Sequence, residues 1–423
     1  LGAAYDMDGA FNNVVLTLRA RSSLPAVIER LDRLLEPYGG LGAYGRDEMT
    51  AIAIDEWMGA SPIYTRRMQQ LLGFGRGDVE TIFKGMQFDI GAPPEFMDFR
   101  YRVTDANHGE FWLDHCGALM DVEPMGEDYV HAMCHTIEDP TFDATAIATN
   151  RRAQVRPIHR PPREPADRQP HCHWTVTIDD AHPELPLPEV MAPVQATRLA
   201  ALELGPIGRG ATDAEVADGW NDYTAPLDPD LVTERFSTAA LRVLAEEVCV
   251  QQHLLVMSFG AAIERRHGTE DAVAVVDRQF TGIAGLTSQR LRDAFGAGDG
   301  SRSGTTLADV AQVLDLHPAF RPRAYVDWRV ELADDRLELT LGDCPARHER
   351  GMETWISRLA DGHDDGLAAA VEGVTPYARL ERTGPSRWSV TMADEPAPDR
   401  SEVALTRFST GATFVFIRYR GAQ

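Results

Sequence analysis

Three cysteines and several histidines gather in one part of this 423-residue chain. Cys116 follows a histidine, Cys134 precedes one, and Cys172 lies between two more. Thiolate and imidazole groups bind metals such as zinc and iron, and they also serve as nucleophile and base. The neighbouring histidines are His115, His135, His171 and His173. The pattern therefore predicts a functional site between residues 115 and 173.

One chemistry that this cluster could support is metal binding. Cys116, Cys134 and Cys172 would supply three thiolate ligands to Zn²⁺ or iron, with His173, another histidine or water as the fourth. Intervals of 17 and 37 residues separate the cysteines, so the closely spaced pair of a zinc knuckle is missing. The alternative is that the thiols are small buried apolar groups.

A metal-free chemistry would use a thiolate as the nucleophile. Cys134 would attack, His135 or His115 would act as the base, and Glu138 or Asp139 would orient it. His135 and Glu138 are three residues apart, so on a helix they share a face. The structural alternative for that pair is a solvated helix end.

The local pattern predicts which elements carry the cysteines. Residues 97–103 and 110–115 alternate in polarity around a turn with Asn107 and Gly109, which is typical of a β-hairpin. This places Cys116 at the end of the second strand. Residues 126–139 have helical spacing and should end at Pro140, and residues 171–179 form a further strand.

Two other segments near the site also have distinctive composition. Residues 156–170 contain five prolines and no apolar periodicity, which predicts an extended surface loop. The arginines of this loop could bind a substrate carboxylate or form surface ion pairs. Residues 196–204 are predicted to form another strand.

Composition and charge narrow the class of protein. A hydrophobic fraction of 43% is ordinary for a globular protein, and the length allows two to three domains. The net charge of −24 argues against nucleic acid or an anionic membrane as a partner. No apolar run reaches the roughly 20 residues of a membrane span. The expected partner is a small-molecule substrate. The sequence is also compatible with a homo-oligomer.

The number and placement of the cysteines indicate the cellular compartment of the protein. An odd number of cysteines, clustered with histidines, fits a reducing compartment better than a disulfide framework. No signal peptide is visible, although the chain begins at Leu1 and an upstream segment could be missing. We therefore expect a cytoplasmic protein.

An internal duplication is visible in the sequence. The hairpin from Asp98 pairs with residues 327–346, and residues 171–184 pair with 385–398. We therefore predict an α+β fold of two modules, 48–205 and 206–423, after an N-terminal βα element at 1–47. In each module, helices precede an antiparallel hairpin sheet.

The two copies differ at the cysteines. Cys116 corresponds to Cys344, Cys172 corresponds to Arg387, and Cys134 has no clear counterpart. A purely structural role would predict the cluster in both copies. The first copy is therefore expected to hold the site and the second to support it.

The pattern of Cys116, Cys134 with Asp139, and Cys172 with Trp174 resembles the L-2-amino-thiazoline-4-carboxylic acid hydrolase family. It is more distantly similar to the 4-vinyl reductase domain. The first resemblance implies an α+β hydrolase acting on a C–N or C–S bond of a small molecule, such as a cyclic amidine. The second implies the alternative, a small-molecule or metal-binding sensor without turnover. Residues 1–47 resemble part of the periplasmic domain of lipoprotein-release-type ABC permeases.

Overall fold

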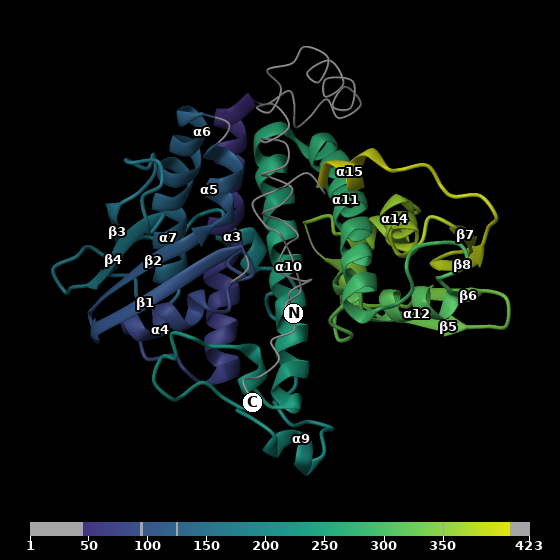
Figure 1. Ribbon diagram of the computed structural model, residues 1–423, viewed down its shortest axis with the longest axis horizontal. Coiled ribbons are helices and arrows are strands. Elements are labelled where there is room, and N and C mark those ends of the chain that lie inside the picture. Colours follow the sequence, from purple (N-terminus) through teal and green to yellow (C-terminus); the bar gives the residue numbers. More distant parts are fainter. Residues whose placement is uncertain (1–44, 94–95, 124–125, 350, 407–423) are drawn as a thin grey trace.

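The structure is a computed structural model that describes residues 45–93, 96–123, 126–349 and 351–406 (Figure 1). It contains two antiparallel four-stranded sheets with helices packed on them, which confirms the predicted α+β class. Nearly all of the βα element predicted for residues 1–47 lies outside the described residues, and its last three residues belong to the first described helix.

The first module, residues 45–178, carries the cysteine cluster. Its elements are α3 (Gly45–Leu72), α4 (Val79–Met86), β1 (Met97–Asp105), β2 (His108–Cys116), α5 (Gly117–Val122), α6 (Glu127–His131), η3 (Ala132–Ile137), α7 (Glu138–Ile147), β3 (Ala153–His159) and β4 (Cys172–Ile178). The strand order is β1-β2-β4-β3, all antiparallel. The predicted hairpin and the strand beginning near Cys172 are both confirmed.

Alternation along β4 determines which side chains face the helices. Cys172, Trp174 and Val176 are buried, whereas the residues between them are only partly buried. Successive side chains of a strand point to opposite faces, so the buried set lies on the helix-covered face. His173 therefore lies on the other face of the sheet from Cys172.

Three local predictions were wrong. The helix does not end at Pro140, because the π-helix η3 runs directly into α7 and Pro140 occupies the third position of α7. A proline lacks an amide hydrogen, and the π-helical turn before Pro140 changes the hydrogen-bond pattern of the helix at this point. Residues 156–159 belong to strand β3 instead of a loop. Residues 196–204 form turns without a strand.

The second module, residues 269–406, repeats the sheet. A connection with α8 (Met191–Gln195), α9 (Asp213–Ala217) and η4 (Thr233–Arg235) leads to the long helix α10 (Thr238–His267). The module contains α11 (Thr269–Phe295), α12 (Leu307–Leu316), η5 (Pro318–Phe320), β5 (Trp328–Leu332), β6 (Leu337–Leu341), η6 (Pro345–His348), α13 (Trp355–Ala360), α14 (Asp365–Val374), β7 (Ala378–Gly384), β8 (Arg387–Met392) and α15 (Ser401–Thr406). Its strand order, β5-β6-β8-β7, is the same as in the first sheet.

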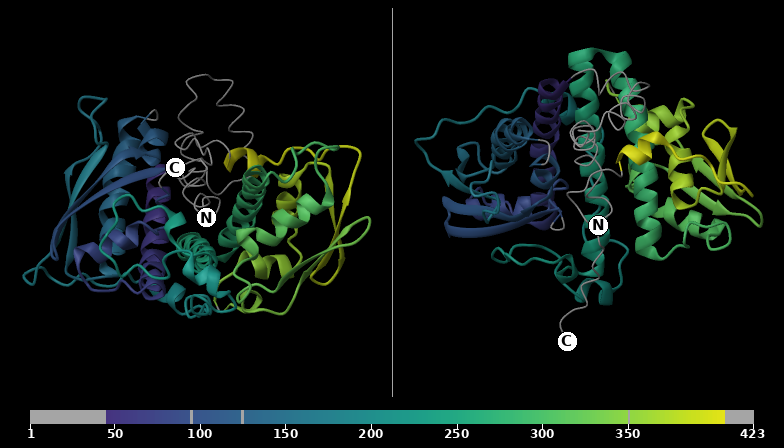
Figure 2. Two further views of the ribbon diagram at one scale, coloured as in Figure 1. Left: turned by 60° about the horizontal axis from the view of Figure 1, so that its bottom comes forward. Right: turned by 45° about the horizontal axis from the view of Figure 1, so that its top comes forward.

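Helix α10 joins the two modules. It packs against α3 on one side and α11 on the other, and the two sheets lie on opposite sides of it (Figure 2). Arg67 of α3 forms a two-pronged ion pair with Glu247 of α10, with N–O distances of 2.6 and 2.8 Å. Paired carboxylate and guanidinium groups of this geometry fix orientation as well as charge. The first module is therefore held firmly against α10.

Within the described residues, no helix combines the length and the apolar character that crossing a membrane requires.

Candidate functional site

Three buried thiols lie in one apolar cluster of the first module. Cys116 ends β2 and caps the start of α5, where its Sγ accepts a hydrogen bond from the Leu119 amide at 3.4 Å. Cys134 is in the π-helix η3, and Cys172 begins β4 opposite Leu113. All three are free cysteines. Segments 56 residues apart in sequence thus bring the predicted thiols into the same core.

A buried carboxyl group lies among these thiols. Glu138 begins α7, and burial raises the pKa of its side chain to about 8. Burial is the main cause that raises the pKa of Cys116, Cys134 and Cys172. The negative charge of ionised Glu138 is the second cause for all three thiols. Its Oε2 atom is buried and has no hydrogen-bond partner among the described residues. The carboxyl group is therefore protonated at neutral pH, with capacity left for one more hydrogen bond.

The environment of the thiols disfavours the thiolate. Burial raises the pKa of Cys116 to about 12, and it raises the pKa of Cys134 and Cys172 well above the usual value. A nucleophilic cysteine needs the opposite, a pKa lowered by a nearby cation or helix N-terminus. The geometry thus gives no support to Cys134 as the nucleophile.

Metal coordination also lacks a suitable arrangement. Across the part of the chain that the structure describes, no group of three or more His, Cys, Asp or Glu side chains is placed to hold a metal ion. The predicted fourth ligand, His173, is on the opposite face of the sheet, where its Nε2 lies 2.9 Å from Glu110 Oε2. His173 is therefore separated from the cysteines. Zinc or iron binding stays a prediction.

The rings of the two predicted bases contact groups other than the thiols. His135 Nε2 lies 2.7 Å from the carbonyl oxygen of Pro161, so this ring fastens a loop to the helix. The ring of His115 packs beside that of His171, with 5.9 Å between centroids. His171, which was not among the predicted site residues, touches the cluster: its Nδ1 accepts a hydrogen bond from the Cys116 amide at 3.1 Å. It positions the end of β2.

The proline-rich loop between β3 and β4 is fastened over this region by ion pairs. Arg160 pairs with Asp139, and Arg163 pairs with Glu123 through two contacts of 2.9 and 2.7 Å. The Arg160 guanidinium also lies over the Trp174 ring at 5.7 Å. Of the two roles open to these arginines, the surface ion pair is the one observed. They close the site instead of facing a substrate.

A cavity of about 150 Å³ lies next to the thiol cluster. Its wall is mostly apolar and comes from α3, the segment after α4, β1, α5, η3 and α7. The lining residues are Met49, Thr50, Ala53, Trp57, Met86, Asp89, Gly91, Ala92, Phe96, Met97, Phe99, Ala118, Met133, Ile137, Glu138, Thr141, Phe142 and Thr145. Glu138 borders the cavity, but none of the three cysteines does. The thiols therefore lie behind the wall that Glu138 completes.

Asp89 is the second carboxyl group on the wall, and the sequence patterns did not identify it. Its Oδ1 accepts hydrogen bonds from the Tyr64 hydroxyl at 3.0 Å and from the Gly91 amide at 2.9 Å. The segment that carries it is tied to α10, since the Gln251 side chain accepts from the Ile90 amide and donates to the Phe88 carbonyl. Burial raises the pKa of Asp89 to about 6.

No family model, curated protein or solved structure matches the chain significantly. The resemblance to thiazoline carboxylic acid hydrolases and to the 4-vinyl reductase domain therefore stays a prediction. The class that fold and site define is an α+β protein with one hollow, carboxyl-bearing module.

Proposed function

We propose that the first module binds a small, largely apolar molecule in the cavity between α3 and the sheet. The observation that carries this proposal is a cavity of about 150 Å³ whose wall is apolar except for a few polar groups, among them Glu138 and Asp89. Ligand sites are typically concave and apolar, with a small number of placed polar groups and carboxyls of shifted pKa. A volume of this size accommodates a molecule of about one aromatic ring.

Glu138 would orient the ligand. A buried carboxyl group with a pKa of about 8 carries a proton at pH 7 and donates one hydrogen bond. Its Oε2 lacks a partner among the described residues, and an unsatisfied buried polar atom costs about 1–3 kcal/mol. A ligand acceptor at this point would remove that cost. The three thiols would act as an apolar support behind the carboxyl group.

A second candidate is hydrolysis of a C–N or C–S bond, the activity that the sequence resemblance implies. It is favoured by the presence of two carboxyl groups of different pKa on one wall, about 6 for Asp89 and about 8 for Glu138. Such a pair suits a base and an acid. Asp89 would take a proton from water, and Glu138 would give one to the leaving nitrogen or sulfur. Both proposals place the ligand in the same cavity.

Two glycines allow a matched test of the binding proposal. A Cβ atom at Gly91 would come within 1.9 Å of the Trp57 ring, which forms part of the cavity wall. A Cβ at Gly366 would come within 2.1 Å of the Phe280 ring in the second module. Each Gly→Ala change therefore displaces one aromatic ring, the partly buried Trp57 or the buried Phe280, but only Trp57 borders the cavity.

We expect benzyl alcohol to bind the wild-type protein saturably in a calorimetric titration, and Gly91→Ala to weaken this binding at least tenfold. Gly366→Ala should leave the affinity within about twofold, although it lowers the melting temperature. Circular dichroism would show that both variants are folded. Equal affinity in the wild type and in Gly91→Ala would refute the location, and absence of saturable binding would refute the proposal.

Turnover separates the two candidates. 2-Amino-2-thiazoline contains both a C–N and a C–S bond in one small ring, so release of thiol from it reports hydrolysis. Loss of thiol release in both Asp89→Asn and Glu138→Gln would support the hydrolase. Binding without release would leave the ligand-binding function alone.

A further inference from the structure

The titratable groups on the cavity wall are all acidic. Asp89 and Glu138 are the only ionisable carboxyl groups among the lining residues, and no lysine, arginine or histidine lines the cavity. Arg160 and Arg163 of the loop between β3 and β4 are engaged in ion pairs with Asp139 and Glu123, which do not line the cavity. An anionic ligand would therefore meet a carboxylate and find no cation to pair with.

Asp89 is a buried carboxylate that hydrogen bonds alone compensate. Among the described residues it forms no ion pair, and its donors are the Tyr64 hydroxyl and the Gly91 amide. With a pKa of about 6, the group is mostly ionised at pH 7.5. Taking a charge out of water is costly unless an opposite charge pairs with it. A cation arriving in the cavity would supply that pairing.

Aromatic rings complete a site suited to a cation. Trp57, Phe96, Phe99 and Phe142 all border the same cavity. The faces of aromatic rings attract ammonium groups, and the attraction is stronger where water is excluded. The carboxylate and the rings would thus both attract an ammonium group in this cavity, while the methionines of the wall contact an apolar body.

We propose that the cavity selects a small apolar amine, bound as the ammonium ion with its nitrogen at Asp89. This inference rests on the proposed function, because it names the chemical class of ligand for the same cavity. It also conflicts with a carboxylic acid as the ligand. The thiazoline carboxylic acid that the resemblance suggests would bring its carboxylate to a wall without a cation.

The alternative role for Asp89 is to tie the segment after α4 to Tyr64 of α3. Asp89→Asn separates the two roles, because an amide oxygen still accepts the hydrogen bonds from Tyr64 and Gly91 while the charge is removed. A merely structural Asp89 would give the variant unchanged selectivity between charged and neutral ligands.

The test compares three probes of nearly the same shape: benzylamine, benzyl alcohol and benzoate. In calorimetric titrations at pH 7.5, wild type should bind benzylamine at least tenfold more tightly than benzyl alcohol, and benzoate should not bind. In Asp89→Asn, the ratio of the benzylamine affinity to the benzyl alcohol affinity, both measured in the same variant, should fall to about one. Thermal melting would verify that the variant is folded.

Three outcomes would overturn the inference: equal affinity of the amine and the alcohol for the wild type, saturable binding of benzoate, or an amine preference that persists in Asp89→Asn. Binding of benzyl alcohol without an amine preference would leave the proposed ligand-binding function standing. Absence of binding by all three probes would contradict both proposals.

Discussion

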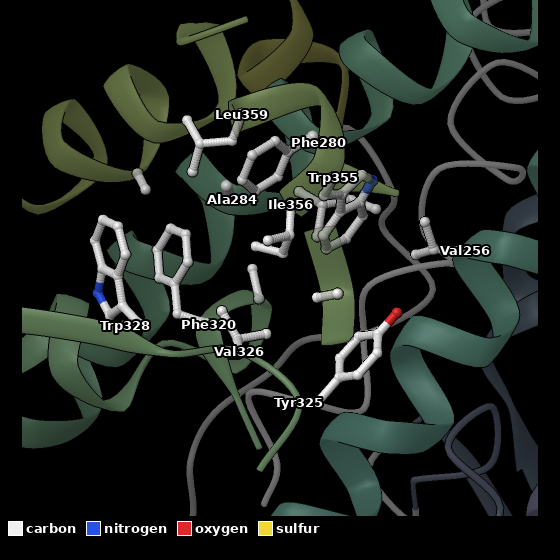
Figure 3. Packing of buried hydrophobic residues seen from close by; sticks show 14 of the residues in the cluster. Val256, Phe280, Ala284, Phe320, Tyr325, Val326, Trp328, Trp355, Ile356 and Leu359 are labelled. Carbon is white, nitrogen blue, oxygen red and sulfur yellow. The ribbon is translucent and has the colours of Figure 1, made fainter. Parts of the chain in front are cut away.

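The two modules have the same strand order but fill the space between sheet and helices differently. In the second module, the rings of Phe280 and Trp355 stack with 5.0 Å between centroids, and those of Phe320 and Trp328 stack at 4.3 Å (Figure 3). In the first module, the helices and β1 instead border a cavity of about 150 Å³ with Glu138 and Asp89 on its wall. One architecture thus supports a filled core and a hollow one.

The difference concerns function because a pocket bordered by buried carboxyl groups lowers the stability of the fold. Cavities forfeit packing contacts, and buried carboxyl groups have to be desolvated. The second module shows that the same sheet topology is compatible with close packing. The fold therefore does not require the lost packing and the buried carboxyl groups of the first module. Such departures from close packing are expected at binding sites, where they serve function.

The largest expected contrast is in stability after truncation. Trp355 is almost fully buried against Phe280, so Trp355→Ala should lower the free energy of unfolding by about 3–5 kcal/mol. Met133 is half-buried and already borders the cavity, so Met133→Ala should cost only about 1 kcal/mol. Urea unfolding of both variants gives the two values. Similar losses would mean that the first core is packed as tightly as the second.

The second contrast is in the direction of pH dependence. Burial raises the pKa of Glu138 to about 8, whereas it lowers the pKa of His253 and of His317 to about 4. Folded Glu138 holds its proton between about pH 4.5 and 8 while the unfolded chain releases it, so its contribution to stability falls as pH rises through this window. The two histidines stay neutral when folded, so their contribution is lost as pH falls from about 6.5 to 4.

Unfolding measured from pH 4 to 9 should separate the two windows. Asp89, with a pKa of about 6, adds its own decline below about pH 6. Glu138→Gln should therefore remove the decline between pH 6 and 8, which we expect to amount to on the order of a few kcal/mol. His317→Asn should flatten the acid side and leave the Glu138 decline in place. A decline above about pH 6.5 that persists in Glu138→Gln would show that another group titrates there.

Local patterns predicted the elements that carry the cluster. The alternation around Asn107 and Gly109 gave the hairpin, and with it the position of Cys116 at a strand end. The same alternation along β4 places Cys172 and His173 on opposite faces. The period of the strand was thus sufficient to exclude His173 from the thiol set, although the cluster of residue types suggested otherwise.

The cavity and Asp89 could not be predicted in this way. Asp89 follows a short helix and lies in no motif, and its place depends on Tyr64 and on Gln251 of α10, which is 162 residues further along the chain. A cavity exists where side chains from several distant elements fail to meet, and no local period encodes that. The continuation of the helix through Pro140 likewise depends on the π-helix before it.

The smallest contrast concerns the cysteines themselves, Cys134 in the first module and Cys344 in the second. Both are buried thiols, and neither lines the cavity, so each Cys→Ala change should lower the free energy of unfolding by only about 1 kcal/mol. Because the thiol of Cys134 supports Glu138 from behind, Cys134→Ala should alter benzyl alcohol affinity about twofold, and Cys344→Ala should not alter it.

The metal content of the same untagged proteins should be measured by elemental analysis. A metal present in wild type and lost only in Cys134→Ala would contradict this expectation, since the thiols would then be ligands instead of packing groups. The first module would be a metal site, and its difference from the second module would lie in the cysteines more than in the cavity.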